Sequence, residues 1–269
     1  MKIGICAIMA PWDLPYVKEW AEYHAYIGIT DFLLFLNNWK PEEVEKLWTL
    51  LVSLPPKCHV RIVKNFDGKA MQVAAYNQGM AIMTALGIDW CAFIDLDEFL
   101  KIRSTRTLEQ ILDTFKDKKS VSVNWRLFGS SGIEKVEEVY DPDPLDITDR
   151  FNVLSRFTKC ERNLNQHVKQ IVHLGIDPGI VFISPHCTNV MSVTTDGHPL
   201  YGPWNLTDLD KPHELELSHY ATKSRQECME RRTKTRADSG QVREEGWETF
   251  FNQHDKNEID ESTIEYKGA

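Results

Sequence analysis

Short apolar runs alternate with helix-like patterns along the first half of the chain. Continuous apolar runs that end at turn residues predict buried strands. The predicted strands are Lys2–Met9, Phe32–Leu36, Val60–Val63, Trp90–Ile94 and Ser120–Trp125. Apolar residues at helical spacing predict helices at about Leu14–Ile27, from Pro41 onward, at about Ala70–Leu86 and near Leu108–Phe115. Alternating strands and helices indicate an α/β fold with a mostly parallel central sheet and helices on both faces.

The second half of the chain is less regular. Turn residues interrupt it, as in Asp141-Pro142-Asp143-Pro144. Short strands near Gly179–Ile183 and Asn189–Val193 are predicted to pair in an antiparallel or mixed way, and a helix is predicted over Ser224–Arg236. The tail at 254–269 is polar. We therefore expect a regular parallel region followed by a mixed region.

Composition and charge narrow the class of protein. The 269 residues carry a net charge of −9, with 42% hydrophobic and 26% charged residues, as in a soluble globular protein. This charge argues against a nucleic-acid binder, which needs a surplus of Lys and Arg on one face. None of the six cysteines forms a C-x-x-C pair, and Cys6 and Cys91 lie in apolar runs, which indicates buried thiols in a reducing compartment. No apolar window reaches a membrane-spanning length. We expect a cytoplasmic protein, and peripheral contact with a membrane stays open.

A pair of carboxylates follows the predicted strand Trp90–Ile94. Asp95 and Asp97 are two residues apart, so in extended backbone they point to the same side. In parallel sheets, ligands bind beyond the carboxyl ends of the strands, where this pair lies. Two such carboxylates repel each other unless a cation lies between them, and a hard divalent cation could also bind a diphosphate. An exposed acidic turn or a helix cap is the structural alternative.

The run Ile94-Asp95-Leu96-Asp97-Glu98-Phe99 resembles the D-x-D-E-F signature of glycosyltransferase-2-like enzymes related to glycosyltransferase family 92. Four further matches to that family occur in the same order, from about residue 3 to about residue 235. They are Glu19-Trp20 with Tyr23-His24 and Gly28, Gln72 with Ala75-Tyr76-Asn77, Trp125 with Phe128–Gly132, and His219-Tyr220 with Lys223-Ser224. Each match is weak alone, but five in order are specific.

This resemblance implies a glycosyltransferase of the GT-A fold. The expected organisation is a single domain over 1–269. Residues 1–125 would form the nucleotide-sugar-binding half, 126–240 the acceptor side with a metal ligand, and 254–269 a polar tail. The resemblance also implies Mn²⁺ or Mg²⁺ and a nucleotide-sugar donor, a UDP-sugar with galactose as one candidate sugar. It suggests an inverting transfer to a glycan or a lipid-linked acceptor, and it leaves the oligomeric state open.

Two loops depart from the family pattern. Met9-Ala10-Pro11-Trp12 stands where relatives carry Lys-Asn-Glu, and Asn37-Asn38-Trp39 stands where they carry Asp-Asn. Both loops are expected near the nucleotide. The departures therefore leave the base and the exact donor open.

The resemblance assigns further candidate site residues. His219 is the candidate third metal ligand beside Asp95 and Asp97; otherwise it would be a packed histidine at a strand end. Gln72, Asn77 and Lys223 are candidates for binding the donor, although the amides could equally cap structure.

Candidates for substrate binding are an aromatic residue, a glycine-rich loop and isolated polar residues, of which Lys169 could contact a phosphate. An aromatic face stacks on a sugar ring, and glycines let backbone approach a ligand closely. A core tryptophan followed by a turn is the structural alternative. The substrate-binding candidates are Trp125, Phe128, Gly129, Ser130, Ser131, Gly132, Lys169 and His186. Asp196 and Glu134 are candidates for the base that an inverting transfer needs.

Two other classes of function compete with the transferase. A metal-dependent phosphohydrolase would also use paired carboxylates on a parallel sheet, but it would be expected to show further ligand clusters, and a G-D motif is missing from the sequence. A noncatalytic carbohydrate-binding protein on a degenerate transferase scaffold would fit the two altered loops. The intact Asp95, Asp97 and His219 argue against it.

Overall fold

The fold is known from a computed structural model, which describes residues 1–66, 68–135, 153–155, 164–206, 213–234, 246–255 and 257–259. The strands are β1 (Ile3–Met9), β2 (Asp31–Asn37), β3 (His59–Phe66), β4 (Trp90–Phe93), β5 (Glu98–Ile102), β6 (Ser120–Leu127), β7 (Val153–Ser155), β8 (Val168–His173), β9 (Phe182–Ser184), β10 (Cys187–Thr188), β11 (Ser192–Thr194), β12 (Pro199–Leu200), β13 (Leu215–His219) and β14 (Asn257–Ile259). The helices are η1 (Pro11–Tyr16), α1 (Val17–Tyr26), α2 (Pro41–Val52), α3 (Gln72–Ala85), α4 (Leu108–Asp113), η3 (Leu164–Gln166), α6 (Arg225–Arg232) and α7 (Trp247–His254).

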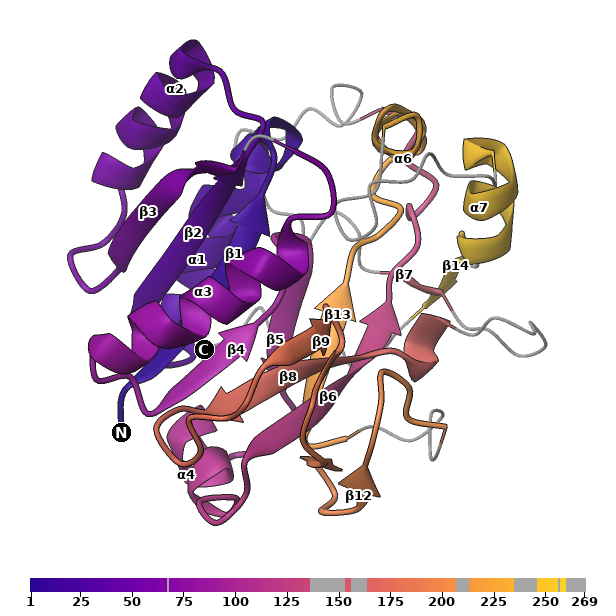
Figure 1. The fold of residues 1–269 in the computed structure, drawn as a ribbon. Helices are drawn as coiled ribbons and strands as arrows, with labels where there is room; N and C mark the ends of the chain where they lie inside the picture. The colour runs from indigo at the N-terminus through magenta and orange to yellow at the C-terminus, as the bar shows by residue number, and fades with distance from the viewer. Residues whose placement is uncertain are drawn as a thin grey trace.

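One large sheet organises the molecule (Figure 1). Its strand order is β12-β11-β6-β8-β4-β1-β2-β3, and β13 joins β6 to β5. Within the run β4-β1-β2-β3, each strand is parallel to the next. Beyond β4 the sheet is mixed, because β8 runs antiparallel to both β4 and β6, whereas β11 and β13 run parallel to β6. The predicted α/β fold with a mostly parallel central sheet and a mixed second region is confirmed.

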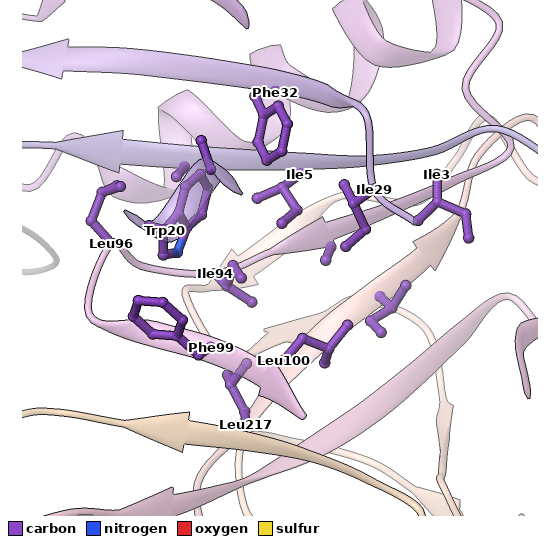
Figure 2. Close-up of a cluster of buried hydrophobic side chains, with 14 of the residues drawn as sticks. Ile3, Ile5, Trp20, Ile29, Phe32, Ile94, Leu96, Phe99, Leu100 and Leu217 are labelled. Atoms are coloured by element: carbon purple, nitrogen blue, oxygen red, sulfur yellow. The ribbon is translucent and has the colours of Figure 1, made fainter. Parts of the chain in front are cut away.

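Two apolar cores lie on the two faces of this sheet. Alternate residues of a strand point to opposite faces, so Ile5 of β1 joins one core and Cys6 the other. The first core gathers side chains from α1, α2 and α4, and Figure 2 shows Trp20, Phe32 and Phe99 within it. The second core packs α3 against the sheet. Cys6 and Cys91 are buried and free, as predicted.

Three elements of the structure were not predicted from the sequence: the strands β8 and β5 and the 3-10 helix η1. The strand β8 escapes apolar patterning because Lys169 and Gln170 are polar yet almost completely buried. In the same way β5 begins with the buried Glu98. The predicted helix at Leu14–Ile27 starts instead with the 3-10 helix η1, which contains Pro15. Proline has no backbone N–H to donate inside an α-helix.

The predicted polar tail does not begin at residue 254. His254 is the last residue of α7 and is buried, and β14 pairs with β7 just beyond it. Residues 260–269 lie outside the described part of the chain, as do Arg236 at the predicted end of the helix from Ser224 and the turn at Asp141–Pro144.

Among the helices that the structure describes, none has both the length and the apolar character needed to cross a membrane.

Candidate active site

A cavity of about 330 Å³ opens at the carboxyl ends of the parallel strands. The ends of β1 and β2 line one side, through Ala10 and Asn37, and the turn after β4 contributes Asp95 and Asp97. The opposite side comes from β6, β8, β13, α6 and α7. The cavity therefore lies between the parallel region and the mixed region, at the edge where parallel sheets bind ligands. Both loops that depart from the family pattern reach it.

The carboxylate of Asp95 is held by three side chains. Its Oδ1 accepts hydrogen bonds from Gln72 Nε2 at 2.7 Å and from the Tyr76 hydroxyl at 3.1 Å. Its Oδ2 accepts one from Lys169 Nζ at 2.9 Å. Gln72 and Tyr76 are four residues apart on α3, so they lie on the same face of that helix. Asp95 is thus oriented by both regions of the chain.

Lys169 is a buried cation in the floor of the cavity. Its side chain is only 1% exposed, and its Nζ lies 3.8 Å from Glu98 Oε2 as well as 2.9 Å from Asp95. Burial lowers the pKa of Lys169, but the neighbouring Asp95 and Glu98 outweigh that effect and raise the pKa above its usual value. Burial raises the pKa of Glu98 well above its usual range, and Asp95 and Asp97 add to the increase. The neighbouring carboxylates therefore favour the charged form of Lys169, whereas burial favours the neutral form of Glu98.

Asp97 is almost completely buried and faces two basic side chains. Its Oδ2 accepts a hydrogen bond from the guanidinium of Arg231 and lies 3.7 Å from His219 Nε2. Burial raises the pKa of Asp97, but Arg231 and then His219 outweigh that effect, so its pKa is well below the usual range. Asp97 is consequently an ionised carboxylate inside the cavity.

The predicted metal ligands are only partly assembled. No group of three or more His, Cys, Asp or Glu side chains in the described ranges is placed to hold a metal ion. Asp97 and His219 form a pair of suitable donors, while both oxygens of Asp95 are bonded to protein groups. Mg²⁺-type ions commonly use one or two protein ligands and take the rest from water and substrate phosphates. The pair Asp97 and His219 therefore fits a metal that binds together with a diphosphate.

A cluster of aromatic and imidazole rings lines the side of the cavity formed by β6 and β8. The Trp125 ring stacks on His167, with centroids 5.0 Å apart, and lies 5.1 Å from His186 and 4.1 Å from His219. Burial, followed by the charge of Lys169, lowers the pKa of His186 well below its usual value. Its Nδ1–H donates to Val168 O at 3.0 Å, which leaves Nε2 as an acceptor.

Two buried nitrogens of this wall lack a hydrogen-bond partner among the described residues. They are Trp125 Nε1 and His219 Nδ1, and both residues line the cavity. A buried polar atom without a partner costs free energy, so such atoms in a cavity wall favour a polar ligand.

The structure brings only some of the predicted residues to the cavity. Those that line it are Asp95, Asp97, His219, Gln72, Trp125, Lys169 and His186. Asn77 does not: its side chain donates to Phe182 O at 3.1 Å and accepts from Phe182 N–H at 2.7 Å. It therefore fastens β9 to α3. Lys223 is buried, with its Nζ 4.0 Å from the centre of the Tyr16 ring, outside the cavity lining.

The predicted sugar platform at Phe128–Gly132 serves the packing instead. Phe128 is fully buried and stacks on Tyr220. The Ser130 N–H and hydroxyl both donate to the Asp255 carboxylate at the end of α7. Gly129, Ser131 and Gly132 complete this turn, in which the last two have positive φ angles of 55° and 76°. The loop anchors α7, and none of its residues lines the cavity.

The two predicted bases also lie elsewhere. Asp196 accepts a hydrogen bond from His213 Nδ1 at 2.7 Å in the turn between β11 and β12. Glu134 is 3.6 Å from Arg225, and its side chain is 63% exposed. Neither lines the cavity, which argues against both as the base.

Several residues at the site were not predicted: Tyr76, which donates to Asp95 without lining the cavity, and Asp13, His167 and Arg231, which line it. Tyr76 belongs to the match of Gln72 with Ala75-Tyr76-Asn77. Its spacing of four residues from Gln72 indicates that the two side chains share one face of the helix. Arg231, Asp13 and His167 carried no such signal, because only the tertiary fold brings them to Asp97 or Trp125.

Solved structures of other proteins resemble parts of this fold. A mannosyltransferase from Pyrobaculum calidifontis, solved with GDP-Man and Mn²⁺, matches 45% of this chain at 13% identity, with a TM-score of 0.36. The match covers 35% of that protein's chain. HddC from Yersinia pseudotuberculosis matches 65% of this chain and 75% of its own at 10% identity, with a TM-score of 0.37. No curated protein matches this sequence.

The sequence also matches a family model, that of glycosyltransferase family 92, over residues 5–242. The match spans both regions of the sheet and every candidate ligand named above. It favours the transferase over the metal-dependent phosphohydrolase. The chain belongs to glycosyltransferase family 92 and is a glycosyltransferase.

Proposed function

We propose that the enzyme takes its sugar from a nucleotide-diphosphate donor, a UDP-sugar with galactose as a candidate, with the help of Mn²⁺ or Mg²⁺. The acceptor would be a glycan or a lipid-linked glycan, and the transfer would invert the anomeric configuration. One observation carries the proposal: the ionised, buried Asp97 lies 3.7 Å from His219 in a cavity at the carboxyl ends of β1 and β4. Such a pair suits a hard cation that binds together with a diphosphate.

The donor would bind with its diphosphate near Asp97 and His219. A divalent cation held there supplies Lewis-acid stabilisation of the departing nucleotide diphosphate. Asp95 lies two residues away, and its orientation is fixed by Gln72, Tyr76 and Lys169. We propose that Asp95 binds the donor in this fixed orientation, as a direct or a water-mediated metal ligand.

The acceptor side of the cavity would be the ring cluster around Trp125. The Trp125 indole N–H can donate to a sugar hydroxyl, and its ring offers an apolar face. His186 Nε2 can accept from another hydroxyl. Because its pKa is well below 6.5, His186 suits hydrogen bonding to the substrate better than holding an abstracted proton.

Calorimetric titration with UDP tests the donor site. The wild type is expected to bind UDP in the presence of Mn²⁺ and to lose most of that affinity with EDTA. Asp97→Asn should weaken binding by about a hundredfold or more, because even changes to residues that only orient a metal ligand cost up to about a hundredfold in affinity. The matched control is Asp177→Asn, which removes a carboxylate paired with the exposed Lys119 far from the cavity.

GDP and dTDP titrations separate the base preference from the metal site. If GDP or dTDP binds with Mn²⁺ and UDP does not, the result contradicts the proposed uridine donor and supports the proposed diphosphate site. Equal UDP binding by wild type and Asp97→Asn would contradict the proposed role of Asp97. A screen of UDP-sugars, read by UDP release and by the anomer formed, then identifies the sugar and the stereochemical course.

A further inference from the structure

The positively charged Arg231 is hydrogen-bonded to Asp97, the carboxylate that the proposed metal would need as a ligand. Arg231, near the end of α6, donates from Nη1 to Asp97 Oδ2. This is the same oxygen that lies 3.7 Å from His219 Nε2. A divalent cation bound between Asp97 and His219 would meet the guanidinium at close range, and two positive charges cannot share that oxygen without strong repulsion.

The exposure of the two partners differs. Asp97 is 2% exposed, and its position is fixed by the turn after β4, where its carbonyl accepts from the Tyr220 N–H. Arg231 is 29% exposed and extends into the cavity on a long side chain. A ligand that competes for this pair would therefore displace the more exposed arginine more easily than the buried carboxylate.

Arg231 also has the right chemistry for the other half of the ligand. A guanidinium offers a planar set of donors that matches phosphate oxygens in a bidentate way. Helix α6 presents it reproducibly, because Ser224 and Glu227 form a capping box at the first turn and Glu227 also accepts from the Tyr16 hydroxyl. The helix thus brings a phosphate-binding group to within contact of the metal-binding carboxylate.

We propose that Arg231 is an exchangeable counterion: it neutralises Asp97 in the ligand-free enzyme and moves to the diphosphate when the nucleotide sugar arrives. Release of Asp97 then lets it bind the metal together with His219. This inference rests on the proposed donor site and adds a mechanism that couples its two ligands. Metal alone binds poorly because Arg231 competes for Asp97. Metal and diphosphate together bind well, because the diphosphate draws Arg231 away from Asp97 and the metal takes the place of Arg231 on that carboxylate.

The coupling predicts opposite effects on two ligands from one substitution. Arg231→Gln removes the competitor, so Mn²⁺ alone should bind about tenfold more tightly, measured by electron paramagnetic resonance of free Mn²⁺. The same variant loses a charge-assisted hydrogen bond to the phosphates. UDP at saturating Mn²⁺ should therefore bind about ten- to hundredfold more weakly in calorimetry. By linkage, the factor by which UDP strengthens Mn²⁺ binding must fall in this variant.

Two further variants separate this exchange from a general charge effect. Arg231→Lys keeps the competing charge but not the planar fork, so Mn²⁺ alone should bind as weakly as to the wild type and UDP with intermediate affinity. Arg225→Gln removes a charge from the same helix, where the arginine faces Glu134 outside the cavity, and should change neither affinity. Tighter Mn²⁺ binding by Arg231→Gln would itself show that this variant is folded.

Each result has a defined meaning. Unchanged Mn²⁺ affinity in Arg231→Gln overturns the competition, and unchanged UDP affinity overturns the transfer of Arg231 to the diphosphate. Loss of both affinities overturns the exchange and leaves Arg231 as a structural support for Asp97. If the wild type binds no nucleoside diphosphate with Mn²⁺, the proposed donor site itself fails and the exchange fails with it.

Discussion

The parallel region and the mixed region bury different kinds of side chain. In the parallel region, β1 and β4 are buried along their whole length and are almost entirely apolar. The mixed region buries a polar network, in which Gln170 of β8 bonds to Ser120 and Ser122 of β6, and Ser122 bonds to Ser192 of β11. Apolar burial stabilises without regard to direction, whereas a buried polar network must satisfy every partner.

The two regions also contribute opposite charges to the cavity. Asp95 and Asp97 follow a strand of the parallel region, while Lys169, His219 and Arg231 come from β8, β13 and α6. Each carboxylate is thus paired across the boundary, Asp95 with Lys169 and Asp97 with Arg231. The site forms only when the two regions pack against each other. Substitutions that remove these charge pairs therefore test the comparison between the regions.

The largest expected effect comes from the buried cation. Lys169→Met leaves Asp95 without its positive partner and should lower the free energy of unfolding by about 3–5 kcal/mol, because breaking a buried ion pair strands a charge. Urea denaturation followed by circular dichroism measures it. Lys119→Met is the matched control, since that pair with Asp177 is exposed and should contribute about 0–1 kcal/mol. A loss no larger than that of the control would mean that the two regions do not depend on this pair.

A smaller effect tests the parallel region through its buried histidine. His24 donates from Nδ1 to Trp20 O and accepts the Leu100 N–H at Nε2, so it is held neutral, and burial lowers its pKa to about 3. The unfolded chain binds this proton near pH 6.5. The contribution of neutral His24 to the free energy of unfolding is therefore complete above that pH. It falls as the pH drops toward 3, by about 2 kcal/mol between pH 6.5 and 5.

His24→Gln should flatten this pH dependence in denaturant titrations between pH 7 and 5. Some slope should remain, because burial also lowers the pKa of His167 and His186. The exposed His59→Gln serves as the control. An unchanged slope in His24→Gln would show that His24 is not the group that titrates.

The smallest effect separates two residues of one sequence motif. Asn77→Ala should cost about 1 kcal/mol of stability through its lost bonds to Phe182, with UDP affinity unchanged. Gln72→Ala should weaken UDP binding, because Gln72 lines the cavity and orients Asp95. Calorimetry and thermal unfolding of both variants make the comparison. Weaker UDP binding by Asn77→Ala would place Asn77 in the donor site after all.

The predicted site residues that line the cavity share a local cause. Asp95 and Asp97 were placed beside a cavity because a continuous apolar run ends directly before them. Gln72 was assigned to the site by the motif that it forms with Ala75-Tyr76-Asn77, and it stands at the start of α3. Trp125, Lys169, His186 and His219 also line the cavity, although their roles in the reaction stay predictions.

The predicted site residues that lie away from the cavity share a cause as well. Phe128–Gly132 have the composition of a ligand-binding loop, but Tyr220 and Asp255, more than ninety positions away, make them a packing turn. Asp196 is paired by His213 and Glu134 by Arg225, each from a distant segment. A turn sequence carries no information about which side chain arrives from elsewhere in the chain.

The sequence by itself determined the parallel region, the carboxylates at its edge and the family, because these follow from local apolar periodicity and from short motifs. The tertiary structure alone decided which cations face those carboxylates. Lys169 and Arg231 lie 74 and 134 positions from their partners. Buried charges must be paired, but the identity of the partner depends on the three-dimensional packing of distant strands and helices.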